Sequence, residues 1–313
     1  MEQKALQVGA AVLTLALLLR LAATWERGRQ ELGKTLLLFS TGRMVTETVP
    51  PETEPAAPEP VEAAAVPVFG QQEAELVQVS ASWDVDIPAL LEEPLSWELT
   101  GEQPTVLILH THGTESYAGT DYAQTSPYRT LDTDHNMVSV GERVAALLEA
   151  GGIRVIHDRR LHDHPAYNSA YENARQAITE TLAANPSVCL VLDLHRDAAE
   201  DENGNQKYTA LTLEGKTCAR LMLVMGSDRG SLSYPNWERN LSLAVKLQAC
   251  LEQKHPGLCK PIKLAASRYN QDLSTGALLV EVGTAGNSRE EALAAAEYLA
   301  KGILALAKGA NIS

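Results

Sequence analysis

Two histidines and a glutamate follow a short apolar run near residue 110. The run Val106–Leu109 is typical of a buried strand that enters a loop, so His110, His112 and Glu115 are expected at its carboxyl end. In an open α/β sheet, ligands and reacting groups usually lie at this end of the strands. Side chains alternate along extended backbone, so His110 and His112 are expected to point the same way. Because imidazole is the side chain that most often binds zinc, this segment predicts metal chemistry.

A second apolar run also ends in a histidine. The segment VLDLHRD places His195 at a strand end, followed by Arg196 and Asp197. A single histidine on an apolar strand is more often a core residue. Two strands that each deliver a histidine to the same rim of a parallel sheet favour one shared site.

A third apolar run carries a carboxylate. Glu281 lies between Val280 and Val282 in LLVEVGTAG, where burial is costly unless a metal or a hydrogen bond compensates. At a strand end beside a cation, Glu281 is predicted to act as a general base on water. The alternative is a structural salt bridge, for example to Arg196.

Strand-like and helix-like segments alternate after residue 105. The expected strands are 106–110, 154–158, 188–195, 221–226 and 277–282, with 208–213 as an added edge strand. The expected helices are 136–150, 166–184, 236–254 and 289–308. Such alternation predicts a three-layer α/β fold, in which a mostly parallel sheet carries helices on both faces.

The first 44 residues are expected to form a membrane anchor and a juxtamembrane segment. Residues 5–25 are almost entirely apolar and about as long as a helix that crosses a bilayer. A cleaved signal peptide and a buried core helix are the alternatives. Basic residues lie on both sides of this stretch, so the positive-inside rule leaves its orientation open.

Residues 45–100 are expected to form a linker rich in proline, glutamate and alanine. Fifteen acidic residues and no lysine or arginine lie between Arg43 and Arg129, so the net charge of −14 belongs mostly to this region. Such a composition predicts an extended tether and argues against a nucleic-acid surface. The four cysteines lack the spacing of a zinc site. Residues 101–313 are expected to form the functional domain.

Five segments of this domain, in order, resemble the stage II sporulation protein P family. They are HTHGTESY, RTLDTDHNMVSVG, IHDRRLHDHPAYNSAY, VLDLHRD and VEVGTAGN, spread over residues 105–306. That family consists of membrane-anchored peptidoglycan hydrolases of endospore-forming bacteria, and it is in turn similar to zinc-dependent N-acetylmuramoyl-L-alanine amidases. The resemblance implies a zinc amidase-like fold for residues 101–313.

The resemblance also implies roles for individual side chains. The implied Zn²⁺ ligands are His112, His195 and Asp132, with His110, Glu115 and His135 as alternatives to Asp132 or to a histidine. Asp132 is shorter than the glutamate that the amidases carry at this place. Glu281 is the implied catalytic acid and base, and Arg196 is expected to stabilise an oxyanion or hold a peptide carboxylate. The remaining implied contacts, which orient a ligand or bind substrate, are His162, Asp163 and Asp197.

The implied function is cleavage of the amide between N-acetylmuramic acid and L-alanine during forespore engulfment, with peptide cross-links as a second target. The implied partners are peptidoglycan and the stage II sporulation proteins D and M. The domain is then expected outside the cytoplasm, facing the cell wall on a single-pass anchor in the cell membrane. Two alternatives remain: a non-catalytic, tethered cell-wall binding or scaffolding module, and a metal-dependent esterase or deacetylase of the wall.

Overall fold

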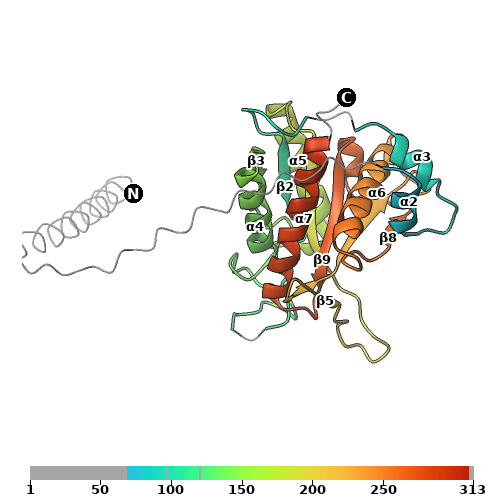
Figure 1. The fold of residues 1–313 in the computed structure, drawn as a ribbon. Helices are drawn as coiled ribbons and strands as arrows, with labels where there is room; N and C mark the ends of the chain where they lie inside the picture. The colour runs from blue at the N-terminus through green and yellow to red at the C-terminus, as the bar shows by residue number, and fades with distance from the viewer. Residues whose placement is uncertain (1–68, 96–97, 120, 310–313) are drawn as a thin grey trace, which may run out of the picture. The chain divides into compact units, whose positions relative to one another are not determined.

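The computed structural model describes residues 69–95, 98–119 and 121–309 (Figure 1). A seven-stranded sheet has the order β1-β8-β7-β9-β4-β2-β3, and every neighbouring pair is parallel except β7 with β9. Its strands are β1 (Val79–Ser80), β2 (Val106–Leu109), β3 (Val155–His157), β4 (Leu190–Asp197), β7 (Leu221–Gly226), β8 (Ile262–Ala265) and β9 (Ala277–Thr284). The expectation of a mostly parallel α/β sheet is confirmed.

Helices cover both faces of the sheet, but unequally. On one face α4 (Met137–Ala150), α7 (Arg289–Gly309) and α6 (Trp237–Lys254) lie side by side, as Figure 1 shows. On the other face α5 (Ala170–Ala184) packs against β2 and β4. Along each strand, alternate residues join one of these two cores, as the side-chain period of two requires.

The α5 face of the sheet is left without a helix over β7 and β9, within the described ranges. There Met222, Val224 and Leu279 form a small apolar cluster that Tyr269 packs against. Tyr269 comes from a loop just before the short 3₁₀ helix η2 (Gln271–Leu273). Strand alternation also places Glu281 on this face, so the uncovered part adjoins a candidate catalytic residue.

The prediction of a linker through residue 100 is wrong for its second half. Residues 71–92 form α2 (Gln71–Leu76), β1 and α3 (Ile87–Glu92). This N-terminal arm is folded because Val77, Leu91 and Leu99 are buried in the main core and β1 extends the sheet beside β8. The proline-rich residues 45–68 lie outside the described residues.

The expected membrane anchor, residues 1–44, also lies outside the described residues. Within the ranges that the structure describes, no helix is long and apolar enough to cross a membrane.

The expected edge strand 208–213 does not join the main sheet. Residues Ala210–Leu213 (β5) pair instead with Lys216–Ala219 (β6) in a separate antiparallel hairpin. The turn between them has positive φ at Glu214 (52°) and Gly215 (79°), the geometry of a tight two-residue hairpin.

Candidate active site

His195 and Glu281 are neighbours across the sheet. In the parallel pairing of β4 with β9 they are partners in register, and both project to the α5 face. The two strand ends that the sequence singled out therefore meet, although they lie far apart along the chain. This pair forms the floor of the candidate site.

His112 joins the pair from the loop that follows β2. Its ring centroid lies 5.4 Å from that of His195, with the two rings nearly perpendicular. Tyr167, from the 3₁₀ helix η1 (Tyr167–Ser169), stacks on the other side of His112 at 4.6 Å, and Tyr171 meets it edge-on. The Nδ1 atom of His112 lies 3.9 Å from Asp163 Oδ2, so Asp163 is placed to orient this ring.

Glu115 is one of the carboxylates that lie against His195. Its Oε2 lies 3.6 Å from His195 Nδ1 and accepts a hydrogen bond from the Arg196 N–H at 3.3 Å. Arg129 Nη2 donates to Oε1 at 3.4 Å. Burial raises the pKa of Glu115, but the hydrogen bond from His195 and the charge of Arg196 outweigh it and hold the pKa at about 2. Glu115 is therefore an ionised oxygen donor within the site.

Asp193 fixes the far side of His195. Its Oδ1 lies 2.9 Å from His195 Nε2, and its carboxylate accepts the Thr111 N–H at 2.8 Å and the Thr111 hydroxyl at 2.6 Å. Burial lowers the pKa of His195, but the nearby Asp193 charge raises it well above its usual value. The sequence analysis did not assign Asp193. The sequence pattern that could have identified Asp193 is its position two residues before His195, because residues two apart on a strand project to the same face.

Glu281 is a buried carboxylate without a hydrogen-bond partner on Oε2. Burial, with a smaller contribution from the negative charge of Glu115, raises its pKa to about 8. A carboxyl group with a pKa near neutrality can both accept and return a proton, which suits a general base and acid.

Arg196 is engaged with the loop that carries Glu115. Its Nε donates to Ser116 O at 3.1 Å, Nη2 donates to Tyr128 O at 3.0 Å, and Nη1 lies 3.6 Å from Glu115 Oε1. The guanidinium is thus placed to position Glu115. The next residue, Asp197, forms an ion pair with Lys260 at 2.9 Å.

The predicted third ligand, Asp132, is paired with His135 and not with His112 or His195. It is exposed on the loop before α4, where its Oδ2 lies 2.9 Å from His135 Nδ1. His135 in turn faces Asp121 and stacks on Tyr122. Asn136 opens α4, as expected, and its side chain accepts a hydrogen bond from the Val138 N–H. Glu115, one of the alternatives named for this ligand, is the residue that lies beside His195.

His110 points to the opposite face from His112, so the expectation that they share a direction is wrong. Strand β2 ends at Leu109, and the chain turns between the two histidines. His110 Nδ1 donates to Leu194 O at 3.1 Å, and its Nε2 lies 2.9 Å from His157 Nε2. Burial lowers the pKa of His110 to about 3. His162 is also buried and bonds to Asp158, at 3.2 Å.

The side chains of His112, Glu115 and His195 are of the types that bind zinc, but they are not arranged in a metal-binding geometry. Among the residues in the described ranges, no group of three His, Cys, Asp or Glu side chains is arranged to hold a metal ion. Two ligand atoms on a tetrahedral zinc lie about 3.4 Å apart, close to the 3.6 Å between His195 Nδ1 and Glu115 Oε2. Nδ1 of His112 is buried and lacks a hydrogen-bond partner. Glu115 and His195 are therefore the pair of side chains that a cation could share.

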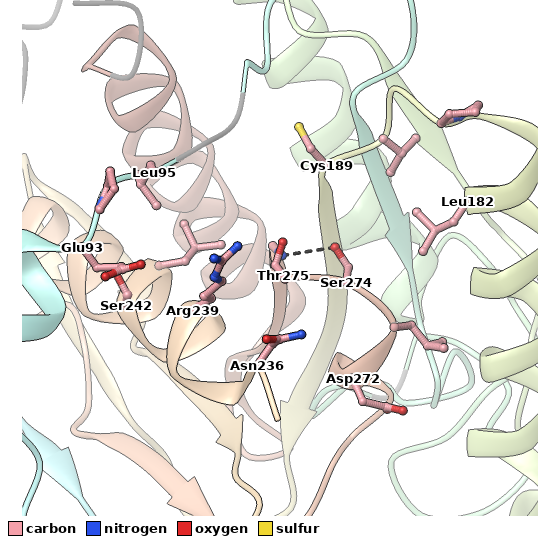
Figure 2. A pocket seen from close by; sticks show the side chains of 16 residues that line it. Glu93, Leu95, Leu182, Cys189, Asn236, Arg239, Ser242, Asp272, Ser274 and Thr275 are labelled. Atoms are coloured by element: carbon pink, nitrogen blue, oxygen red, sulfur yellow. Dashed lines mark hydrogen bonds between the residues drawn. The ribbon is translucent and has the colours of Figure 1, made fainter. Parts of the chain in front are cut away.

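Two cavities of similar volume differ in their position relative to the site. A cavity of about 650 Å³ lies at the opposite rim, where Cys189 and Gly276 precede β4 and β9; no histidine is among the side chains drawn around it in Figure 2. A second cavity, of about 640 Å³, is lined by Arg129, Arg196 and Glu200 and so adjoins Glu115. The second cavity therefore adjoins the candidate site.

Comparison with known proteins identifies a family. The profile of the family described as Stage II sporulation protein P (SpoIIP) matches residues 28–304. Stage II sporulation protein P of Bacillus subtilis (strain 168) is 30% identical over 241 residues, which is 74% of this chain. The chain spans 57% of that relative's length. The family resemblance inferred from the five sequence segments is confirmed.

Two solved structures are more distantly similar. One is the N-acetylmuramoyl-L-alanine amidase AmiC2 of Nostoc punctiforme, with 15% identity, a TM-score of 0.35, and coverage of 67% of this chain and 96% of that one. The other is the N-acetylmuramoyl-L-alanine amidase from Clostridium difficile 630, with 14% identity, a TM-score of 0.37, and coverage of 67% and 95%.

Proposed function

Since the chain belongs to the stage II sporulation protein P family, we propose that its domain is a zinc-dependent peptidoglycan hydrolase. The bond that we propose it cleaves is the amide between N-acetylmuramic acid and L-alanine. One observation supports this most strongly: His112 and Glu115 lie against His195, and the unpartnered carboxyl of Glu281 lies beside His195 on the same face. That arrangement combines metal-binding donors with a general base.

The proposed zinc ligands are His112, Glu115 and His195. Glu115 replaces Asp132 in this assignment because it is ionised and lies within 3.6 Å of His195. When bound, Zn²⁺ supplies a Lewis acid that polarises the amide carbonyl and makes water more acidic. Asp193 holds the imidazole of His195 in one orientation, as carboxylates beside metal-binding histidines commonly do.

Glu281 is the proposed general base and acid. A bound cation beside Glu281 would favour its ionised form, whose unpartnered Oε2 then takes the proton of the attacking water. The same carboxyl then protonates the departing amine of L-alanine. Arg196 is proposed to act on this chemistry through Glu115, which it contacts, and its role at an oxyanion or a peptide carboxylate stays a prediction.

The cellular setting is also a proposal. We propose that residues 5–25 anchor the chain in the cell membrane and that the domain faces the cell wall. The name of the Bacillus subtilis relative refers to stage II of sporulation, which supports a role in forespore engulfment. The stage II sporulation proteins D and M are the proposed protein partners.

Digestion of purified sacculi by the full chain tests the proposed reaction. We expect release of stem peptides with a new L-alanine amino terminus, loss of that release in EDTA, and recovery with one equivalent of Zn²⁺. A metal-free protein that retains full activity would refute the zinc assignment.

Product masses separate the proposed bond from other targets of the same chemistry. Cleavage of peptide cross-links would convert linked stem peptides into monomeric stem peptides that remain joined to the sugar. An esterase or deacetylase of the wall would release acetate and leave sugar joined to peptide. Either pattern in place of the free stem peptide would replace the proposed amidase activity.

A further inference from the structure

A cavity of about 410 Å³ is lined in part by Tyr269, the residue that packs against the small apolar cluster of β7 and β9. Its walls are the start of α5, the loop after β7 and the loop after β8. Tyr171, Tyr269 and Leu232 are the large side chains in these walls, and we call this space the tyrosine cavity. A Cβ added at Gly230 would lie 2.6 Å from Ala266 O, so the two loops approach too closely for another residue there.

The tyrosine cavity adjoins the candidate active site. Tyr171 meets the His112 ring edge-on at 5.6 Å and lies 6.3 Å from the Tyr269 ring. Tyr269 packs on Met222, which is the partner of Glu281 in the pairing of β7 with β9. Tyr171 therefore contributes both to the wall of this cavity and to the surroundings of His112. The cavity of about 640 Å³ that Arg129, Arg196 and Glu200 line lies on the other side of the candidate site, next to Glu115. We call it the Arg129 cavity.

Tyr269 is held in a strained conformation. Tyr269 and Asn270 both have positive φ, 52° and 58°, which is uncommon for residues other than glycine. The loop is fixed from several sides: Asn270 Nδ2 donates to Tyr171 O at 2.8 Å, and Arg175 makes two hydrogen bonds to Asp272, at 2.9 and 2.8 Å. Backbone strain that the surrounding structure enforces is concentrated at functional sites. The strained position of the Tyr269 ring therefore suggests that this ring has a function.

The chemistry of the tyrosine cavity suits a neutral ring. Its single charged lining residue, Arg268, is paired with Asp272 at 3.3 Å. Two tyrosine rings and Leu232, which is 53% exposed, offer apolar contact, and Ser231 adds a hydroxyl. A pyranose ring has apolar faces that pack on aromatic rings and hydroxyls that bond to polar neighbours. The ionised stem peptide is better matched to the Arg129 cavity.

We infer that the tyrosine cavity binds a hexose ring of the glycan chain, with Tyr269 as its main contact. The sugar side of the substrate then lies in this cavity, and the peptide leaves past Arg129. This assignment rests on the proposed amidase function and adds to it a subsite that makes the enzyme prefer glycan-bearing peptides.

A matched pair of substrates tests the subsite kinetically. A muramoyl peptide and a D-lactoyl peptide share the scissile amide, but only the first has a sugar ring. In the full chain, Tyr269→Ala should raise KM about tenfold for the muramoyl peptide, from the loss of one aromatic contact, and leave kcat and the lactoyl peptide unchanged. Tyr269→Phe should behave as the native protein. Equal effects on both substrates would overturn the subsite and leave the amidase function standing.

Binding of the free disaccharide of N-acetylglucosamine and N-acetylmuramic acid tests it without catalysis. Tyr269→Ala should weaken binding to the full chain about tenfold and Leu232→Ala several-fold. Tyr208→Ala removes a tyrosine that is 58% exposed and far from this cavity in the fold, and it should change nothing. Tyrosine-dependent binding without any amide cleavage would support the subsite and refute the amidase. Binding that is insensitive to both Tyr269→Ala and Leu232→Ala would overturn the subsite.

Discussion

At the scale of single residues, the candidate site depends on which carboxylates are paired. Asp193 and Glu115 have charged or hydrogen-bonding neighbours and keep a lowered pKa, whereas Glu281 has an unpartnered oxygen and a pKa raised to about 8. Environments that push the pKa values of neighbouring acids apart assign them different roles. Here the different pKa values separate Glu115, the proposed ligand, and Asp193, the positioning residue, from Glu281, the proposed base.

Glu281→Gln should abolish hydrolysis while leaving the fold intact. Glutamine keeps the shape of the side chain but cannot take the proton of water, so release of stem peptide should fall about 10²- to 10⁴-fold. Zinc content and thermal midpoint should stay close to native. Glu290→Gln, an exposed position at the start of α7, is the control. Undiminished release from the Glu281 variant would exclude Glu281 as the base, and no release from the native protein would favour a binding module.

Asp193→Asn should weaken zinc binding without abolishing it. The amide is the same size but loses the charge that faces His195, so affinity should fall about 10- to 100-fold in a chelator competition assay. Asp84→Asn changes an exposed acid of the N-terminal arm and should have no effect. Native affinity in the Asp193 variant would mean that His195 is not a ligand held by this carboxylate.

At the scale of elements, helix α4 packs against the two histidines that the site does not use. Gly141 lies in the middle of α4, and an added Cβ would come within 2.5 Å of His110 Nε2 and 2.6 Å of His157 Nε2. Glycine is unfavourable in a helix, so its presence here reflects the space that these rings need. The pair of histidines thus fixes the distance between α4 and the ends of β2 and β3.

Gly141→Ala should destabilise the protein, against the helix propensity of alanine. The propensity gain is about 1 kcal/mol, but overpacking against buried rings typically costs about 1–3 kcal/mol. Urea unfolding should show a lower free energy of unfolding. Ala146→Gly, at an exposed position of α4, provides the matched comparison, with a loss of about 1 kcal/mol from propensity alone. An increase in stability in the Gly141 variant would contradict the packing argument.

At the scale of the whole domain, the N-terminal arm is held to α6 by a buried lysine. Lys246 Nζ donates to Leu90 O at 2.6 Å and to Ser242 Oγ at 2.9 Å. Burial lowers the pKa of Lys246 from 10.5 to about 8. The arm is therefore attached through a group whose charge disfavours the folded state at neutral pH.

The stability that depends on Lys246 should rise with pH. Between about pH 8 and 10.5 the unfolded chain binds this proton and the folded chain does not, so the free energy of unfolding increases with pH. Relative to Lys246→Met, the native protein should gain about 3 kcal/mol across this window in urea unfolding. Lys216→Met, at an exposed lysine, should show no such slope. Parallel pH profiles for native and Lys246→Met would contradict the assigned pKa.

The sequence by itself determined the alternation of elements, the parallel sheet and three of the strand-end residues, because burial and side-chain periodicity act locally. The same pattern singled out His112, His195 and Glu281 as candidate site residues, whereas the family was recognised from the resemblance of five sequence segments. The sequence misassigned residues 71–92, whose few apolar side chains gain burial only against α6 and β8. Only the tertiary structure placed Glu115, rather than Asp132, beside His195 and separated His110 from His112, because those contacts depend on where a loop turns after its strand ends.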